Sequence, residues 1–188
     1  KQNIAALEAT NADYVIAACP TCAETLEQTY KELFKDDKVW LERAEKLSKK
    51  LKEFSSFVEQ IYADNGRLKN TAGKEKITYH DSCHMRRSLG IYKEPRELLK
   101  SAPGYEFVEM TGADQCCGMA GSFGMKYADL SIQLLNRKLK NIKESGATTV
   151  AVACPACMMQ IGGGIDKMAP NIKIKHIADI LAENLGDN

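Results

Sequence analysis

The residues of this sequence whose type and spacing could do chemistry are its seven cysteines. They fall into four places along the chain: Cys19-Pro-Thr-Cys22, Cys83, Cys116-Cys117-Gly118 and Cys154-Pro-Ala-Cys157. A C-x-x-C turn places two sulfurs on one side of a tight loop, and clustered thiolates at such spacings bind metals. Disulfide frameworks are typical of small secreted domains, and an odd number of cysteines cannot all pair within one chain. The pattern therefore favours a metal centre.

Five of these cysteines are expected to share one site: Cys83, Cys116, Cys117, Cys154 and Cys157. Five thiolates exceed the four ligands of tetrahedral zinc, and two adjacent cysteines crowd a single ion, so a multi-iron cluster is favoured. Zinc with one spare thiol is the alternative. A redox dithiol and buried core cysteines are the interpretations without a metal. Cys19 and Cys22 are expected to form an incomplete second site.

Residues beside the cysteines could tune such a cluster. Gly118 and Gly121 let backbone N–H groups approach closely and hydrogen-bond to sulfur. His84, next to Cys83, is a candidate hydrogen-bond donor to a cluster sulfur or a proton-transfer group, with a structural histidine as the alternative. His176 is assigned no role.

Alternating strand and helix patterns predict an α/β fold, with a mostly parallel sheet and flanking helices. Strands are expected at residues 14–18, 76–80, 105–110, 148–153 and 172–176. Helices are expected at 2–10, 93–102, 125–144 and 177–185, as a short helix after Cys157, and as a long amphipathic helix or helix pair at 37–63, with a loop at 70–76. Thr21 is the expected N-cap of a helix that follows the first CPxC motif, and the helix at 125–144 is expected to turn Leu130, Ile132 and Leu139 inward. Loops that leave the carboxyl ends of parallel strands meet in one crevice. Because the five cysteines follow three of these strands, we expect their sulfurs to converge.

The two CPxC motifs lie in similar surroundings. The second stretch, GATTVAVACPAC (146–157), repeats the pattern of the first, NADYVIAACPTC (11–22). A shared order of helix, turn, strand and CPxC predicts a duplicated module whose first copy is truncated. We expect residues 1–30 to be the end of the first copy, 31–75 a helical connection and loop, and 76–188 the complete second copy. The chain does not begin with Met, and we expect it to be part of a longer protein.

Composition narrows the classes of function. The chain has 26 basic and 25 acidic residues and a formal net charge of +1, which gives no electrostatic reason to expect nucleic acid as a partner. It contains no apolar run long enough to span a membrane and opens with no secretory signal. These features predict a cytoplasmic protein.

The five-cysteine pattern resembles the cysteine-rich, or CCG, domain family, and three stretches carry the resemblance: YHDSCHMRRSLG, CCGMAGSFG and CPACMMQI. The sequences of these stretches are most similar to those of the iron–sulfur subunits of glycolate and D-lactate oxidases. More distant relatives are the cysteine-rich subunits of heterodisulfide reductase and of anaerobic glycerol-3-phosphate dehydrogenase. The resemblance covers roughly residues 76–188, and residues 2–30 resemble the end of a preceding repeat.

The resemblance implies a [4Fe–4S] cluster, non-cubane in some relatives, held by Cys83, Cys116, Cys117, Cys154 and Cys157, with zinc as the alternative. It implies an electron-transfer subunit of an oxidoreductase complex, which works with a flavin-containing dehydrogenase subunit and other iron–sulfur domains. Electrons would pass towards quinone, at the inner face of the membrane. The alternatives are a catalytic cluster that cleaves heterodisulfides and a structural zinc-binding domain.

Overall fold

The computed structural model describes residues 1–66 and 75–183, which contain two parallel β-sheets. The larger sheet has four strands, which lie in the order β4 (Tyr105–Phe107), β3 (Glu75–His80), β5 (Thr149–Val152) and β6 (Lys173–His176). The smaller sheet pairs β1 (Val15–Ala17) with β2 (Leu51–Glu53). Every pair of neighbouring strands is parallel, which confirms the expected α/β fold with mostly parallel sheets and flanking helices.

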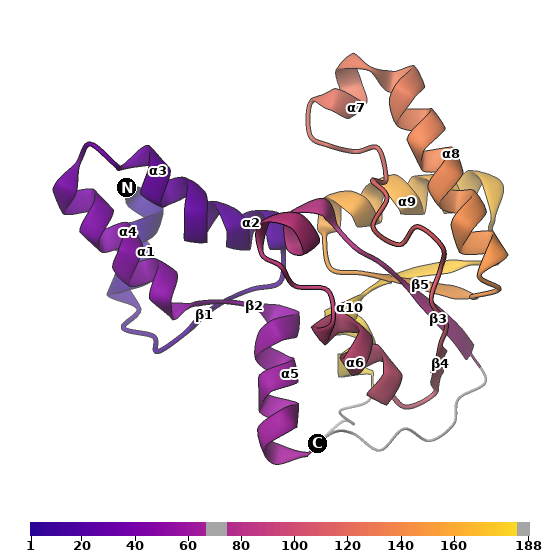
Figure 1. The fold of residues 1–188 in the computed structure, drawn as a ribbon, viewed down its shortest axis with the longest axis horizontal. Helices are drawn as coiled ribbons and strands as arrows, with labels where there is room; N and C mark the ends of the chain where they lie inside the picture. The colour runs from indigo at the N-terminus through magenta and orange to yellow at the C-terminus, as the bar shows by residue number, and fades with distance from the viewer. Residues whose placement is uncertain (67–74, 184–188) are drawn as a thin grey trace.

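Helices cover both faces of the larger sheet (Figure 1). One face carries α5 (Phe54–Asn65), α6 (Glu94–Ser101) and α10 (Ile177–Ala182), and the other carries α8 (Ala128–Glu144) and α9 (Pro155–Met168). Successive side chains of a strand point to opposite faces. Ala151 therefore packs in one core, while Val150 and Val152 pack in the other. Burial on both faces accounts for the continuous apolar run of β5.

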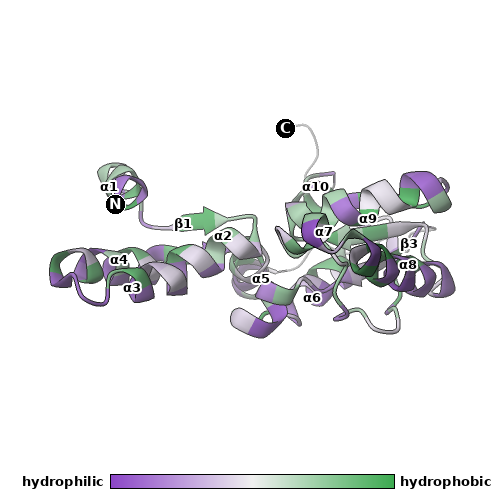
Figure 2. Cartoon of the chain, turned by 90° about the horizontal axis from the view of Figure 1, so that it is seen from above, coloured by the Kyte–Doolittle hydropathy of each residue, from purple (hydrophilic) through white to green (hydrophobic). Residues whose placement is uncertain are grey.

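The first part of the chain forms a smaller unit beside this sheet, and Figure 2 shows β1 as an apolar strand set apart from it. Its helical elements are α1 (Gln2–Ala9), α2 (Pro20–Glu24), the π-helical turn η1 (Thr25–Thr29), α3 (Tyr30–Leu33) and α4 (Lys38–Lys50). Ile4, Phe34, Ala44 and Leu47 form its own core. Helix α2 packs against η2 (His84–Ser88), the π-helical turn that follows β3. This contact brings the first CPxC motif close to the larger sheet.

The prediction of a helix or helix pair over residues 37–63 misses strand β2, which separates α4 from α5. Apolar positions keep a helical spacing across this strand, so the break leaves no mark on the pattern. These apolar positions nevertheless pack in two different cores. Leu47 packs in the core of the first part of the chain, and Phe54 packs against the α6–α10 core. Pairing with β1 imposes the strand, and such pairing between distant segments overrides local helical preference.

Two apolar faces differ from expectation. The sequence predicts a buried strand at 14–18, but Ile16 is 48% exposed, on a strand paired only with β2 among the described residues. Leu130 and Ile132 are expected to face inward on α8, yet both are about half exposed. Together with the short helix α7 (Phe123–Lys126), the start of α8 extends beyond the sheet (Figure 1), whereas Leu139 is buried as predicted.

The remaining expected strands and helices are present with shifted ends. The helix after Cys157 is longer than expected, since α9 runs to Met168. The predicted loop at 70–76 and the end of the last helix lie largely outside the described residues. Within 1–66 and 75–183, none of the helices combines the length and the apolar character that crossing a bilayer requires.

Candidate metal centre

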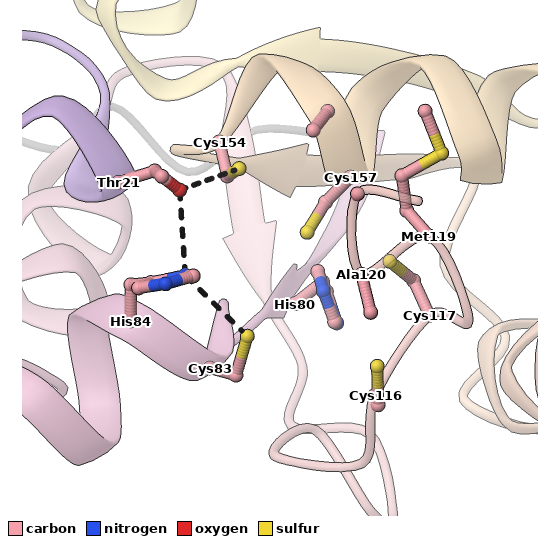
Figure 3. A pocket seen from close by; sticks show the side chains of 12 residues that line it. Thr21, His80, Cys83, His84, Cys116, Cys117, Met119, Ala120, Cys154 and Cys157 are labelled. Atoms are coloured by element: carbon pink, nitrogen blue, oxygen red, sulfur yellow. Dashed lines mark hydrogen bonds between the residues drawn. The ribbon is translucent and has the colours of Figure 1, made fainter. Parts of the chain in front are cut away.

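Cysteines from three loops meet at one cavity beside the carboxyl ends of the larger sheet (Figure 3). Cys83 follows β3, Cys116 and Cys117 lie in the loop after β4, and Cys154 and Cys157 lie at the start of α9. The cavity has a volume of about 380 Å³, and all five cysteines line it. The structure thus brings together every thiol that the sequence assigns to one site, while their ligation of a metal stays a prediction.

The start of α9 presents two of these thiols. Cys154 is the N-cap residue and Pro155 occupies the first helical position, where a missing N–H leaves no hydrogen bond unmade. The Cys157 thiol, and then the backbone N–H groups of Cys157 and Ala156, hydrogen-bond to Cys154 and lower its pKa to about 5. Burial opposes this shift but does not cancel it. Cys154 is therefore a thiolate at neutral pH, the form that binds metals.

The CCG loop depends on its glycine. Gly118 has a φ of +93°, and a Cβ there would lie 2.4 Å from the carbonyl oxygen of Ser131. Its backbone N–H donates to the sulfur of Cys116 at 3.3 Å, as expected from the sequence, while its carbonyl accepts from the Ser131 hydroxyl at 2.9 Å. Gly121 also lines the cavity. A side chain at position 118 would thus push the loop away from α8.

Negative charge gathers on Cys117. The thiols of Cys116 and Cys157 hydrogen-bond to its sulfur and hold the pKa of Cys117 far below its ordinary value. The same contacts raise the pKa values of Cys116 and Cys157, because each of these thiols keeps its proton. Cys116 shares its proton with Cys117, and Cys157 shares its proton between Cys117 and Cys154. Several thiols compete for few protons in a small volume. A cation bound there would relieve this competition.

His84 and Thr21 close the cavity on the side of α2. The His84 Nδ1 lies 3.7 Å from the Cys83 sulfur, as its predicted role requires, although that role stays a prediction. The Thr21 hydroxyl lies 3.4 Å from the same Nδ1 and 4.0 Å from the Cys154 sulfur. Thr21 belongs to the first CPxC motif, so this motif contributes a side chain to the cavity of the second (Figure 3).

Lys138 binds the loop segment that precedes the CCG sequence. Its side chain is fully buried on α8, and its ammonium donates to the carbonyl oxygens of Gly112 at 2.6 Å and Ala113 at 3.0 Å. Burial lowers the pKa of Lys138 to about 8, against the opposing effect of the Cys117 and Asp81 charges. The lysine therefore places positive charge beneath the cysteine-lined loop.

Asp81 ties the end of β3 to the same loop. Its buried carboxylate accepts from both terminal nitrogens of Arg96, at 2.8 and 2.9 Å, and from Arg86 at 3.1 Å. Its backbone N–H donates to the carbonyl oxygen of Ala113 at 3.1 Å. Bidentate pairing of this kind fixes orientation as well as charge. Asp81 thereby positions the segment that carries Cys83.

The first CPxC motif lies at the edge of this arrangement. Cys19, and not the predicted Thr21, is the N-cap residue of α2. Cys22 is exposed and its pKa is raised, chiefly by a hydrogen bond with Cys19. Neither thiol lines the cavity of the other five. Within the described residues, Cys19 and Cys22 lie apart from the cavity of the other five thiols, and their assignment to an incomplete second site stays a prediction.

Three residues at or under the cavity are missed by reasoning from the sequence: His80, Thr21 and Lys138. His80 is the last residue of β3, and its ring lies beside the sulfurs of Cys117 and Cys157 (Figure 3). A signal for His80 exists, because strand alternation places it opposite the apolar Tyr79. No comparable signal marks Thr21 or Lys138, since tertiary packing alone brings them to the site.

Comparison with known proteins gives a family match that covers the cysteine motifs of this chain. The cysteine-rich domain family matches residues 1–27 and 77–162. Lactate utilization protein A of Bacillus subtilis (strain 168) is 36% identical over 173 residues, which cover 91% of this chain and 71% of that protein. The corresponding protein of Lysinibacillus sphaericus (strain C3-41) is 35% identical over 181 residues, 96% of this chain and 77% of that protein.

A third relative is the probable glycolate oxidase iron-sulfur subunit of Bacillus subtilis (strain 168). It is 38% identical over 188 residues, which cover 99% of this chain but 42% of that subunit. The family match spans both CPxC motifs and the CCG sequence. The chain belongs to the cysteine-rich (CCG) domain family, which confirms the resemblance seen in the sequence.

Proposed function

We propose that this chain is an iron–sulfur electron-transfer subunit of a 2-hydroxy-acid dehydrogenase or oxidase of the glycolate or D-lactate type. The observation that carries the proposal is the convergence of five cysteines on one cavity. The names of the relatives, lactate utilization protein and glycolate oxidase iron-sulfur subunit, support the class of substrate.

The donors around the cavity suit an iron–sulfur cluster. Five sulfurs exceed the needs of one tetrahedral ion, and a backbone N–H already points at one of them. We propose that Cys83, Cys116, Cys117, Cys154 and Cys157 hold a [4Fe–4S] cluster of non-cubane type. Such a cluster, when bound, supplies a site that accepts and releases single electrons. The surrounding N–H groups, Lys138 and His84 would set how readily the site accepts an electron.

A relative named as an iron-sulfur subunit supports the presence of partner subunits, and the identity of these partners is part of our proposal. As a subunit, the chain would receive electrons from a flavin-containing dehydrogenase subunit and pass them, with other iron–sulfur domains, towards quinone. We place it in the cytoplasm, peripheral to the inner face of the membrane through these partners. The division into residues 1–30, 31–75 and 76–188 is part of the proposal, and the family match to 1–27 and 77–162 supports it.

Anaerobic reconstitution with ferrous iron and sulfide tests the proposal. We expect about four iron atoms and four sulfides per chain, visible absorption from thiolate-to-iron charge transfer, and an EPR signal in one redox state. Cys117→Ser should abolish most of this uptake, because Cys117 is the least exposed of the five cysteines and its sulfur lies near that of Cys157. Cys22→Ser is the matched control and should leave the iron content of the five-cysteine site unchanged.

Other results would contradict the proposal. A chain that binds only zinc, with no iron under anaerobic conditions, would favour the structural zinc alternative. A chain that binds no metal would reject a metal centre altogether. Iron uptake that survives Cys117→Ser but fails in Cys22→Ser would move the site to the first CPxC motif.

A further inference from the structure

One histidine at the cavity is buried without a hydrogen bond of ordinary geometry. His80 is 1% exposed, and neither of its ring nitrogens makes such a bond within the described parts of the chain, although the ring lies close enough to the Cys117 sulfur to help lower the pKa of that thiol. The two other histidines differ. His176 contacts the carbonyl oxygen of Ala153 through Nε2, at 2.9 Å, and accepts from the backbone of Ala178 through Nδ1. His84 has contacts with Thr21 and Cys83. Buried polar groups are ordinarily satisfied, so the isolation of His80 needs an explanation.

The surroundings of His80 are those of a metal ligand. A ring nitrogen of His80 and the sulfurs of Cys117 and Cys157 lie within 4.8 Å of one another, and all three residues are buried. Metal–donor bonds of about 2.0–2.3 Å keep the ligands of one ion within about 4.6 Å of each other. The three donors therefore need little movement to share an ion. Imidazole and thiolate together bind zinc, and they also bind iron in some iron–sulfur centres.

The fold holds His80 at this position rigidly. Strand β3 lies between β4 and β5, so its last residue lies between the loops that carry the CCG and second CPxC sequences. His80 pairs in register with Val152 of β5. Alternation along the strand sends Tyr79 into the α6–α10 core and His80 to the opposite side. A ligand on a central strand is preorganised, because moving it would disrupt the sheet.

We propose that His80 is a metal ligand that forms, with Cys117 and Cys157, the buried side of the metal centre. The inference rests on the proposed function, since it requires a metal to be bound at the cavity. Cys83, Cys116 and Cys154 then supply the remaining donors. As a neutral donor, the imidazole adds no negative charge to the centre beyond that of the five thiolates.

Pulsed EPR on the reconstituted chain tests this assignment without any substitution. With ¹⁵N-labelled histidine, the paramagnetic state should show the hyperfine coupling of a directly bound imidazole nitrogen. The coupling should disappear in His80→Gln and persist in His84→Gln, the matched control, whose ring also lies at the cavity. In zinc titrations against a chromophoric chelator, His80→Gln should weaken binding at least about tenfold, and His176→Gln, whose ring does not line the cavity, should not.

The outcomes separate this inference from the proposed function. A centre that takes up iron but shows no histidine nitrogen coupling contradicts the role of His80 alone. Coupling that survives His80→Gln and disappears in His84→Gln transfers the role to His84 and also overturns the assignment. A wild-type chain that takes up no metal overturns the proposed function and this inference together.

Discussion

The two CPxC turns of this chain have nearly the same local structure but very different surroundings. Cys19 has φ −140° and ψ 114°, and Cys154 has φ −112° and ψ 118°. Each is an N-cap residue followed by proline, and each carbonyl accepts a 2.9 Å hydrogen bond from the residue four positions later. The motif by itself therefore builds a turn with two thiols near a helix N-terminus.

The neighbouring strands make the difference. β1 and β5 each pair with a following parallel strand, β2 and β6, in the same way. On its other edge β5 pairs with β3, and the loops after β3 and β4 bring Cys83 and the CCG sequence to the second turn. Among the described residues, β1 has no strand on that edge. The comparison teaches that the CPxC turn supplies two donors, and the sheet beside it supplies the rest.

The largest expected effect compares the two turns directly. Cys154→Ser with Cys157→Ser should lower the iron content of the reconstituted chain at least about tenfold, because it removes two of five converging sulfurs. Cys19→Ser with Cys22→Ser should leave the EPR signal of the five-cysteine site in place. Iron analysis and EPR check both variants. Equal losses in the two variants would show that the turns act as one centre, against the comparison.

The next largest effect concerns the CCG loop, which lies beside the second CPxC turn but not beside the first. Gly118→Ala should destabilise the chain by about 3 kcal/mol, because it combines a left-handed φ with a Cβ placed 2.4 Å from a backbone oxygen. Gly121→Ala, also at positive φ but in open space, should cost about 1 kcal/mol. Urea unfolding measures both free energies. Similar values for the two variants would mean that the loop is free to move away from α8.

Equivalent positions of the two strand pairs provide a third test. Glu53 on β2 pairs with β1, and His176 on β6 pairs with β5. Each of these two side chains also accepts a backbone hydrogen bond at the start of the helix that follows it. Burial raises the pKa of Glu53 to about 7, so the folded chain holds a proton there that the unfolded chain releases near its lower, ordinary pKa. The free energy of unfolding should therefore fall as pH rises towards 7.

Glu53→Gln keeps the capping oxygen and removes the titrating group. In wild type, Glu53 should lower the free energy of unfolding by about 2 kcal/mol between pH 5 and pH 8. We expect this decline to be absent in Glu53→Gln. Denaturant unfolding at the two pH values measures the difference. Glu106→Gln, at an exposed position of β4, is the control and should follow wild type. An unchanged pH dependence in Glu53→Gln would place the titrating group elsewhere.

The smallest effect probes the contact between the two turns. Thr21→Val removes the hydroxyl that lies beside His84 and Cys154, and should cost about 0.5–1 kcal/mol of stability. Thr21→Ser keeps the hydroxyl and should recover most of that loss. Thermal unfolding of the two variants and wild type measures it. If valine and serine behave alike, the hydroxyl does not link the turns.

The convergence of the cysteines could be predicted from the sequence because the prediction depends on local patterns in the chain. Strand patterns ending just before Cys83 and Cys154 are visible in the chain, and parallel strands necessarily bring their carboxyl ends to one edge. Strand β2 could not be predicted in the same way, since three residues of regular helical spacing become a strand only through pairing with β1. The exposure of Leu130 depends likewise on where the start of α8 lies relative to the sheet.

The residue types and their order along the chain determine the two CPxC turns, the glycine beside the cysteine pair and the alternation of strands and helices. Each of these follows from backbone preferences within a few residues. Tertiary structure alone decided that Thr21 reaches the second cavity, that Lys138 lies beneath the CCG loop and that His80 faces two thiols. Those relations join segments far apart in the chain, and their geometry comes from how sheet and helices pack.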